Sequence, residues 1–140
     1  MKTEGDFNAA LSKQFRKAGI FAIKVADKFT IGISDFLILH NSVTLALECK
    51  FISEWPSDRA QLLKHPFTGE QLTFMESVRL AGHRAIGLVA VKEAGKMILI
   101  ESQAIPESGN WNTGDFRGMS RISVPWLETQ PFLEWRLLLG

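Results

Sequence analysis

The spacing of apolar residues predicts a helix at the start of the chain, followed by a strand. An apolar residue recurs every third or fourth position from Phe7 to Ala18, which places these residues on one side of a helix. Thr3 stands at the N-cap position with an acidic residue three positions later, and Gly19 is a natural C-terminal stop. Alternating apolar residues then predict a short strand over 20–26.

The next two apolar runs, 34–40 and 43–51, are separated only by an Asn-Ser pair, which is typical of a tight hairpin turn. If the turn is centred on that pair, one side of the hairpin is wholly apolar. A slip of one residue would scatter the apolar set over both faces, so this register is favoured. The predicted pairs are His40–Val43, Leu39–Thr44, Ile38–Leu45, Leu37–Ala46, Phe36–Leu47 and Asp35–Glu48.

The remaining pattern predicts a mixed α/β domain with the order α-β-β-β-α-β-β. A short helix is expected around 58–64, and a longer one begins after Thr68, with Gln71 in the capping-box position. Further segments are expected as strands at 85–91 and 96–101, an ordered loop at 105–119 and a terminal helix at 131–139.

Composition and charge narrow the class of protein. The chain has 140 residues, of which 46% are hydrophobic, and this suits one globular domain. Sixteen Lys and Arg against fifteen Asp and Glu give a net charge of +1, which excludes a polycationic coat but not a local basic patch. A single cysteine excludes a disulfide framework and favours a reducing cytoplasm, and no membrane or targeting segment is expected.

The predicted hairpin brings two carboxylates together. Asp35 and Glu48 lie directly opposite each other on one sheet face, where they repel by about 0.2–1 kcal/mol even when solvated. Lys50 projects to the same face because alternate residues of a strand share a side. A divalent cation would relieve the repulsion further, since Mg²⁺ binds hard oxygen ligands.

These residues form a recognisable motif: Gly32-Ile33-Ser34-Asp35, twelve residues, then Glu48-Cys49-Lys50. The motif resembles the core of the PD-(D/E)xK nuclease superfamily, in particular its small phage, resolvase-like and VRR-NUC members. The resemblance covers roughly residues 4–91, with Ser34 where proline is usual. It implies a restriction-endonuclease-like core with a central mixed β-sheet flanked by helices. We expect one nuclease domain over 1–140, with a core of about 4–102 and a C-terminal extension of 103–140.

The resemblance also implies roles for individual residues. Metal ligands would be the carboxylates of Asp35 and Glu48 and the backbone carbonyl of Cys49, binding Mg²⁺, with Mn²⁺ able to substitute. Lys50 would contact the attacking water or the scissile phosphate as a compact cation. Glu4 would serve a second ion or act through water, and Gln71 would orient water or phosphate. Expected contacts to nucleic acid are Lys24, Lys28, Lys64 and His65.

Each of these residues could instead have a purely structural role. The hairpin carboxylates and lysine would then form a salt-bridge cluster, Glu4 would favour a helix N-terminus through the dipole, and Gln71 would only complete a capping box. His65, beside a proline, would be a loop residue, and Cys49 is expected in the core rather than as a reactive thiol.

The function expected from the sequence is a Mg²⁺-dependent endonuclease acting on DNA, with branched DNA such as a Holliday junction as a candidate substrate. A homodimer is expected, as in resolvase-like members, and the apolar stretch 125–139 could either form the interface or cover the core. Two alternatives stay open: a sequence-specific restriction-type endonuclease, and a non-catalytic nucleic-acid-binding module on the same fold. The small size suits a phage or a bacterial cell by analogy alone.

Overall fold

The computed structural model describes residues 3–25, 32–118 and 122–125, the last segment for its backbone only. Among these residues, none of the helices has the length and apolarity needed to cross a membrane. The elements in chain order are α1 (Glu4–Ala18), β1 (Phe21–Lys24), β2 (Phe36–His40), β3 (Val43–Ile52), α2 (Gly69–Leu80), β4 (Arg84–Val91), β5 (Lys96–Glu101), the 3₁₀ helix η1 (Ser102–Ala104), α3 (Thr113–Gly118) and β6 (Ile122–Pro125).

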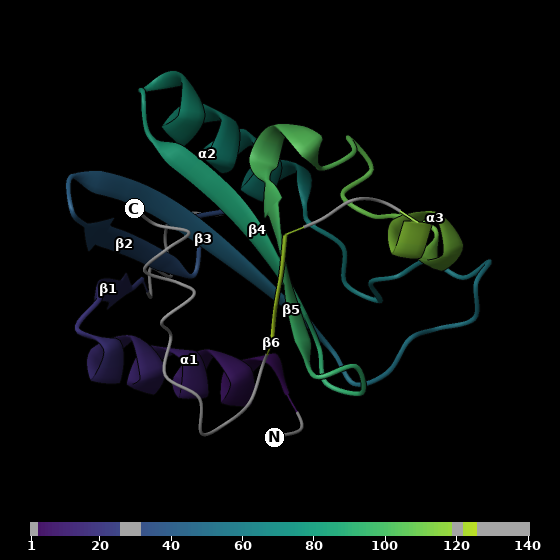
Figure 1. The fold of residues 1–140 in the computed structure, drawn as a ribbon. Helices are drawn as coiled ribbons and strands as arrows, with labels where there is room; N and C mark the ends of the chain where they lie inside the picture. The colour runs from purple at the N-terminus through teal and green to yellow at the C-terminus, as the bar shows by residue number, and fades with distance from the viewer. Residues whose placement is uncertain (1–2, 26–31, 119–121, 126–140) are drawn as a thin grey trace.

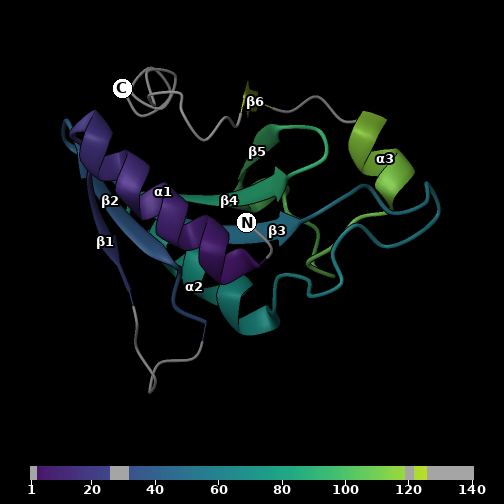
Figure 2. The ribbon, with the colours of Figure 1, turned by 90° about the horizontal axis from the view of Figure 1, so that it is seen from below.

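One mixed sheet with the order β1-β2-β3-β4-β5-β6 forms the centre of the fold. Neighbouring strands are antiparallel except β3 and β4, which are parallel and are connected through α2. Figure 1 shows α1 on one face of this sheet and α2 on the other, and Figure 2 shows α1 lying across its face. The sheet with a helix on each face confirms the central mixed β-sheet flanked by helices that was expected from the sequence.

Two apolar cores, one on each face of the sheet, hold these layers together. The first packs the apolar stripe of α1 against alternate residues of β2, β3 and β4. The second packs Met75 of α2 against the opposite face, together with aromatic residues from the loops. Consecutive residues of β3 divide between them, since Leu45, Leu47 and Cys49 face α1, whereas Ala46 faces α2.

The hairpin of β2 and β3 has the predicted register from His40–Val43 to Phe36–Leu47. Asn41 and Ser42 both have positive φ, 46° and 66°, as a two-residue hairpin turn of the I′ type requires. The ladder ends at Phe36, so Asp35 and Glu48 lie immediately beyond the last paired residues of β2 and β3.

Both predicted helix starts are confirmed. Thr3 caps α1 and Thr68 caps α2, each within a reciprocal capping box that Asp6 or Gln71 completes. Gly19 ends α1 with a φ of 71°, in the left-handed region. The strands expected at 85–91 and 96–101 are β4 and β5, and the one expected at 20–26 is β1, described over Phe21–Lys24.

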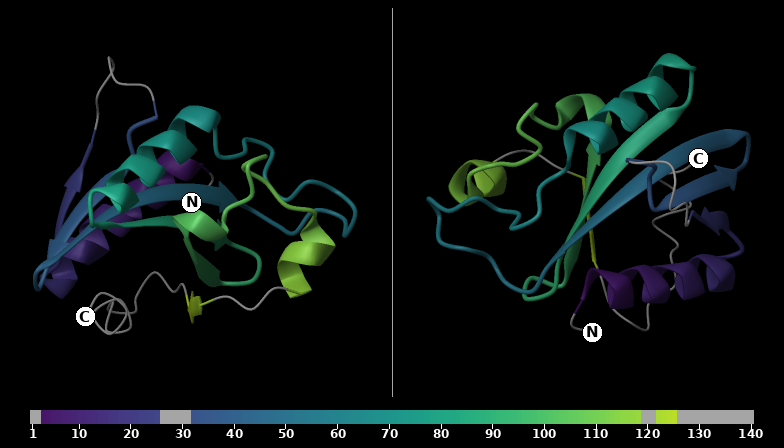
Figure 3. Two further views of the ribbon diagram at one scale, coloured as in Figure 1. Left: turned by 90° about the horizontal axis from the view of Figure 1, so that it is seen from above. Right: turned by 180° about the vertical axis from the view of Figure 1, so that it is seen from behind.

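Two expectations are wrong, and they concern two segments that bond to each other. Residues 58–64 form turns rather than a helix, because their backbone bonds to a distant segment: the N–H of Leu62 donates to the Trp111 carbonyl, and Gln61 forms a bridge with Asn112. The region 105–119 is not wholly a loop, because Thr113–Gly118 form α3, where Asn112 Oδ1 accepts from the N–H of Gly114. Figure 3 shows these two loop segments and α3 together at one side of the molecule.

Strand β6 pairs antiparallel with β5 and was not expected from the sequence. It places a strand of the C-terminal extension in the central sheet. The helix expected at 131–139 lies outside the described residues, as does the greater part of the apolar stretch 125–139 considered as a dimer interface.

Candidate active site

The site lies where β2 begins beside β3. Beyond the last ladder pair, the backbone N–H of Cys49 donates to Asp35 Oδ2 at 2.8 Å, so a carboxylate takes the place of a strand partner. The N–H and C=O of one residue in an extended strand point to the same edge. The carbonyl of Cys49 therefore also faces this opening, as a metal ligand at that position would.

Gly32 allows the segment before Asp35 to approach α2 closely. Its φ of 86° is in the left-handed region, and a Cβ at this position would lie 2.5 Å from the backbone carbonyl of Glu70. A side chain there would push the segment away from the helix. The glycine of the motif thus holds the turn that leads into Asp35.

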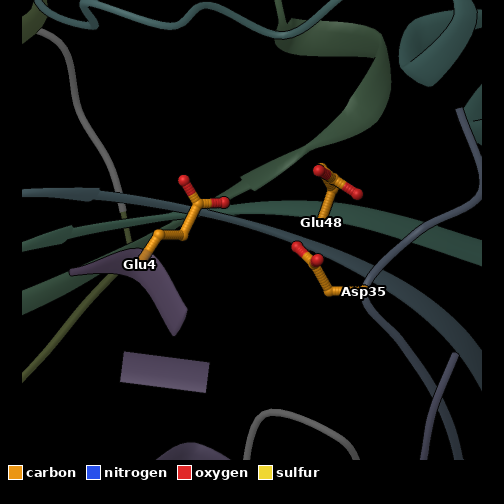
Figure 4. Close-up of side chains that lie close together, drawn as sticks. All are labelled: Glu4, Asp35 and Glu48. Atoms are coloured by element: carbon orange, nitrogen blue, oxygen red, sulfur yellow. The ribbon is translucent and has the colours of Figure 1, made fainter. Parts of the chain in front are cut away.

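Three carboxylates from distant parts of the chain converge at this opening. Glu4 comes from the first turn of α1, Asp35 from the segment before β2, and Glu48 from the middle of β3. One oxygen from each can be chosen so that all lie within 4.8 Å of one another. Figure 4 shows the three side chains pointing toward a common centre. At an effective dielectric of about 20, two unit charges at that distance repel by about 3 kcal/mol, so the cluster is costly when fully ionised.

Burial and mutual repulsion shift the titration of this cluster. Burial, followed by the charge of Asp35, raises the pKa of Glu48 to about 8, although Lys50 opposes the shift. Burial also raises the pKa values of Asp35 and Glu4, with Lys50 again opposing. Each shift reflects a site that disfavours three bare negative charges.

One oxygen of the cluster lacks a protein partner. Oε2 of Glu48 is buried and has no hydrogen-bond partner among the described residues, whereas Oε1 accepts from Gln71 Nε2 at 2.7 Å. If all three carboxylates are ionised, the ammonium of Lys50 matches only one of their charges, and the raised pKa values show that this state is disfavoured without a further cation. An oxygen-rich cluster of this kind, with a buried unpaired oxygen, fits a divalent cation such as Mg²⁺.

Lys50 and Gln71 complete the site on the α2 side. Lys50 is buried, with 6% of the residue exposed, and its ammonium donates to Gln71 Oε1 at 3.2 Å. The same oxygen accepts from the backbone N–H of Thr68 at 2.9 Å. The capping box therefore does not exclude a role in the site for Gln71, because its amide serves both at once.

The structure places the other predicted residues as follows. Cys49 is fully buried in the core facing α1, and burial raises the pKa of its thiol, so only its backbone belongs to the site. Lys24 is close enough to Asp35 for its charge to lower the carboxyl pKa, and His65 acts on Glu4 in the same way. Lys64 is exposed beside His65, and Lys28 lies outside the described residues.

Two further residues near the site were not selected from the sequence. Asn8, one turn after Glu4 on α1, is buried, and its Oδ1 has no hydrogen-bond partner among the described residues. The sequence feature that could have indicated Asn8 is its position four residues after Glu4, within a stripe of otherwise apolar residues. Phe67 lies with its ring under the Lys50 ammonium, with Nζ 5.2 Å from the ring centroid. No local sequence pattern indicates that contact.

Comparisons with known proteins bear on the fold. No protein-family model matches the chain, and no curated protein matches it. Among solved structures, Archaeoglobus fulgidus Hjc, a Holliday junction resolvase, is similar with a TM-score of 0.56 and 17% identity over 86% of this chain and 87% of that chain. A VRR_NUC domain has a TM-score of 0.47 and 20% identity over 67% of this chain and 90% of that one. The similarity to Hjc shows that this chain shares the fold of that resolvase.

Proposed function

We propose that this chain is a divalent-metal-dependent endonuclease that hydrolyses DNA phosphodiester bonds. The observation that carries the proposal is the carboxylate cluster of Glu4, Asp35 and Glu48, with oxygens within 4.8 Å and a buried, unpaired oxygen on Glu48. A cluster built only for stability would pair each carboxylate with a cation, whereas this one groups three carboxylates around one lysine and is disfavoured when fully ionised.

The ligands of the cation would be the carboxylates of Asp35 and Glu48 and the backbone carbonyl of Cys49. Glu4 would serve a second ion or act through water. When bound, Mg²⁺ supplies charge neutralisation at a phosphate and polarises its oxygens, and Mn²⁺ shares this ligand chemistry.

The chain's own residues would do the remaining work. Lys50 would meet the attacking water or a phosphate oxygen, because its buried ammonium carries an unshared positive charge beside the cluster. Gln71 would hold Lys50 and Glu48 in fixed relation, since its Oε1 accepts from the first and its Nε2 donates to the second. Because the Gln71 amide contacts both groups, it keeps the Lys50 ammonium and the Glu48 carboxylate from forming a direct ion pair.

DNA is the proposed substrate, and branched DNA its preferred form. Lys24 and His65 lie near the cluster and Lys64 is exposed close by, so a phosphate backbone crossing the opening would meet positive charge. Hjc is a Holliday junction resolvase, and we extend that substrate to this chain as part of the proposal. Two related cuts at a junction would need two copies of the chain, so we also propose a homodimer.

The test is a panel of labelled linear, flapped and four-way DNA incubated with Mg²⁺ or Mn²⁺. We expect the wild type to cut the four-way substrate fastest and Asp35→Asn to be inactive, because the variant loses a charge while its side chain can still accept from Cys49. Cutting of linear duplex at one sequence would favour a restriction-type enzyme. If the wild type shifts these DNAs on a gel but cuts none with either metal, the chain is a binding module and the proposal fails.

A further inference from the structure

We propose that Phe67 is a positioning residue for Lys50: the face of its ring holds the ammonium where the proposed hydrolysis needs it. The inference rests on the proposed function, but the contact itself can be measured without DNA. The proposal adds to the charged groups of the site an aromatic residue, which a search for titratable side chains would miss.

The ammonium of Lys50 has an unusual set of neighbours for a buried cation. Its Nζ lies 5.2 Å from the centroid of the Phe67 ring and 3.2 Å from Gln71 Oε1. Among the described residues, no carboxylate comes within ion-pairing distance of it. A cation over an aromatic face is attracted by the ring quadrupole, and the attraction is largest where water is excluded. The ring therefore stabilises the charge without neutralising it.

The ring of Phe67 has little freedom to move. A Cβ on Gly87 of β4 would lie 2.9 Å from its Cζ, so the absence of a side chain there makes room for the ring. Trp111 packs against it edge to face, with centroids 6.3 Å apart and planes at 87°. Its backbone is held by Gly109, whose carbonyl accepts from the Phe67 N–H at 3.0 Å. The ring is only 2% exposed.

Both contacts to the ammonium come from the start of α2. Phe67 immediately precedes the N-cap Thr68, and Gln71 is the third residue of the helix. The turn that caps the helix thus carries an aromatic face and an amide oxygen to the same cation. An ammonium has three N–H donors, so these two contacts leave at least one for a phosphate oxygen or a water in the opening.

A purely structural role for Phe67 is the alternative. A hydrophobic staple with Leu72 would account for its burial. Such a staple would not require the ring face to lie under the ammonium. With a purely structural Phe67, a substitution would also leave the cleavage rate of the folded protein unchanged. The two readings therefore differ in what a smaller apolar side chain does to Lys50.

The experiment compares Phe67→Leu with Phe15→Leu. Phe15 is 1% exposed and makes an edge-to-face contact with Phe36 in the other core, so its loss controls for a missing buried ring. Phe67→Met is a second variant that fills more of the space if the leucine variant folds poorly. Each is measured by NMR with labelled lysine, for the ring-current shift of the Lys50 ε-protons, and by single-turnover cleavage of four-way DNA.

In the wild type we expect the Lys50 ε-protons upfield of those of the exposed lysines, and in both Phe67 variants a return toward them. The cleavage rate should fall roughly tenfold in the Phe67 variants, the equivalent of one desolvated cation–π contact, with substrate affinity within about twofold. Phe15→Leu should change neither. An unshifted Lys50 in the wild type, or an equal rate in the Phe67 and Phe15 variants, overturns the inference. If the wild type cuts no DNA, the proposed function fails, and the NMR shift still decides whether the ring holds the ammonium.

Discussion

Replacing Glu48 by glutamine should abolish cleavage and at the same time stabilise the metal-free protein. The substitution keeps an oxygen that accepts from Gln71 Nε2 and turns the unpaired Oε2 into a donor amide beside Asp35. It also removes one of three converging negative charges. A residue kept for stability would show the opposite effect, because most changes at buried positions destabilise.

The magnitude follows from the pKa of Glu48, raised by burial from 4.5 to about 8. The folded state holds a proton that the unfolded state releases between these values, so wild-type stability should fall as pH rises from about 4.5 to 8. At 1.36 kcal/mol per unit, the full shift corresponds to an upper bound on the order of 5 kcal/mol above pH 8. Neighbouring groups share this cost, so we expect Glu48→Gln to gain about 2–4 kcal/mol, or about 5–15 °C in Tm, at pH 8.

The assay is thermal and urea unfolding in EDTA from pH 5 to 9, with Glu107→Gln as the control. Glu107 is exposed on a loop, so the same chemical change there should leave stability and its pH dependence unaltered. Added Mg²⁺ should then raise the Tm of the wild type and of the control but not that of Glu48→Gln. The reasoning is refuted if Glu48→Gln is no more stable than Glu107→Gln at pH 8 without metal.

Three other substitutions test parts of the fold and the surface. Gly109→Ala should lower the free energy of unfolding by at least about 2 kcal/mol, because its Cβ would lie 1.9 Å from the Phe67 carbonyl oxygen and its φ is 73°. Gly118→Ala is the control: a Cβ there has nothing within 4 Å, so its free energy of unfolding in urea should change by no more than about 0.5 kcal/mol. Ser34→Ala should leave stability unchanged or raise it by up to about 1 kcal/mol, because the buried hydroxyl has no partner among the described residues; a clear loss would show that it has one. Lys64→Ala should weaken DNA binding and reduce the slope of log K against log salt by about 1, and an unchanged slope would remove Lys64 from the interface.

Local patterns were sufficient for the elements that position the carboxylates. The period-two alternation of the hairpin has only one register that keeps an apolar face, so Phe36–Leu47 and the pairs before it could be predicted. That register brings Asp35 and Glu48 to the same end of the hairpin. The capping boxes at Thr3 and Thr68 are equally local, and they set where Glu4 and Gln71 lie on their helices.

Contacts between distant segments could not be predicted in this way. Residues 58–64 have helix-forming character, but Asn110 binds both the N–H and the carbonyl of Leu63, and this long-range pairing prevails over propensity. The Lys50–Phe67 contact depends on Gly87 in a later strand. Neither contact could be predicted without knowledge of the fold, because the partners are separated by many residues in the chain.

The central claim is that the carboxylate cluster is a divalent metal centre, and Mn²⁺ binding followed by electron paramagnetic resonance tests it most directly. Wild type, Asp35→Asn and Asp115→Asn would be titrated with Mn²⁺ under the same conditions, Asp115 being an exposed carboxylate on α3. We predict that the wild type and Asp115→Asn bind Mn²⁺ alike, that Mg²⁺ competes for the site, and that Asp35→Asn loses it. Equal binding by Asp35→Asn and the wild type, or no saturable binding by the wild type, would contradict the account.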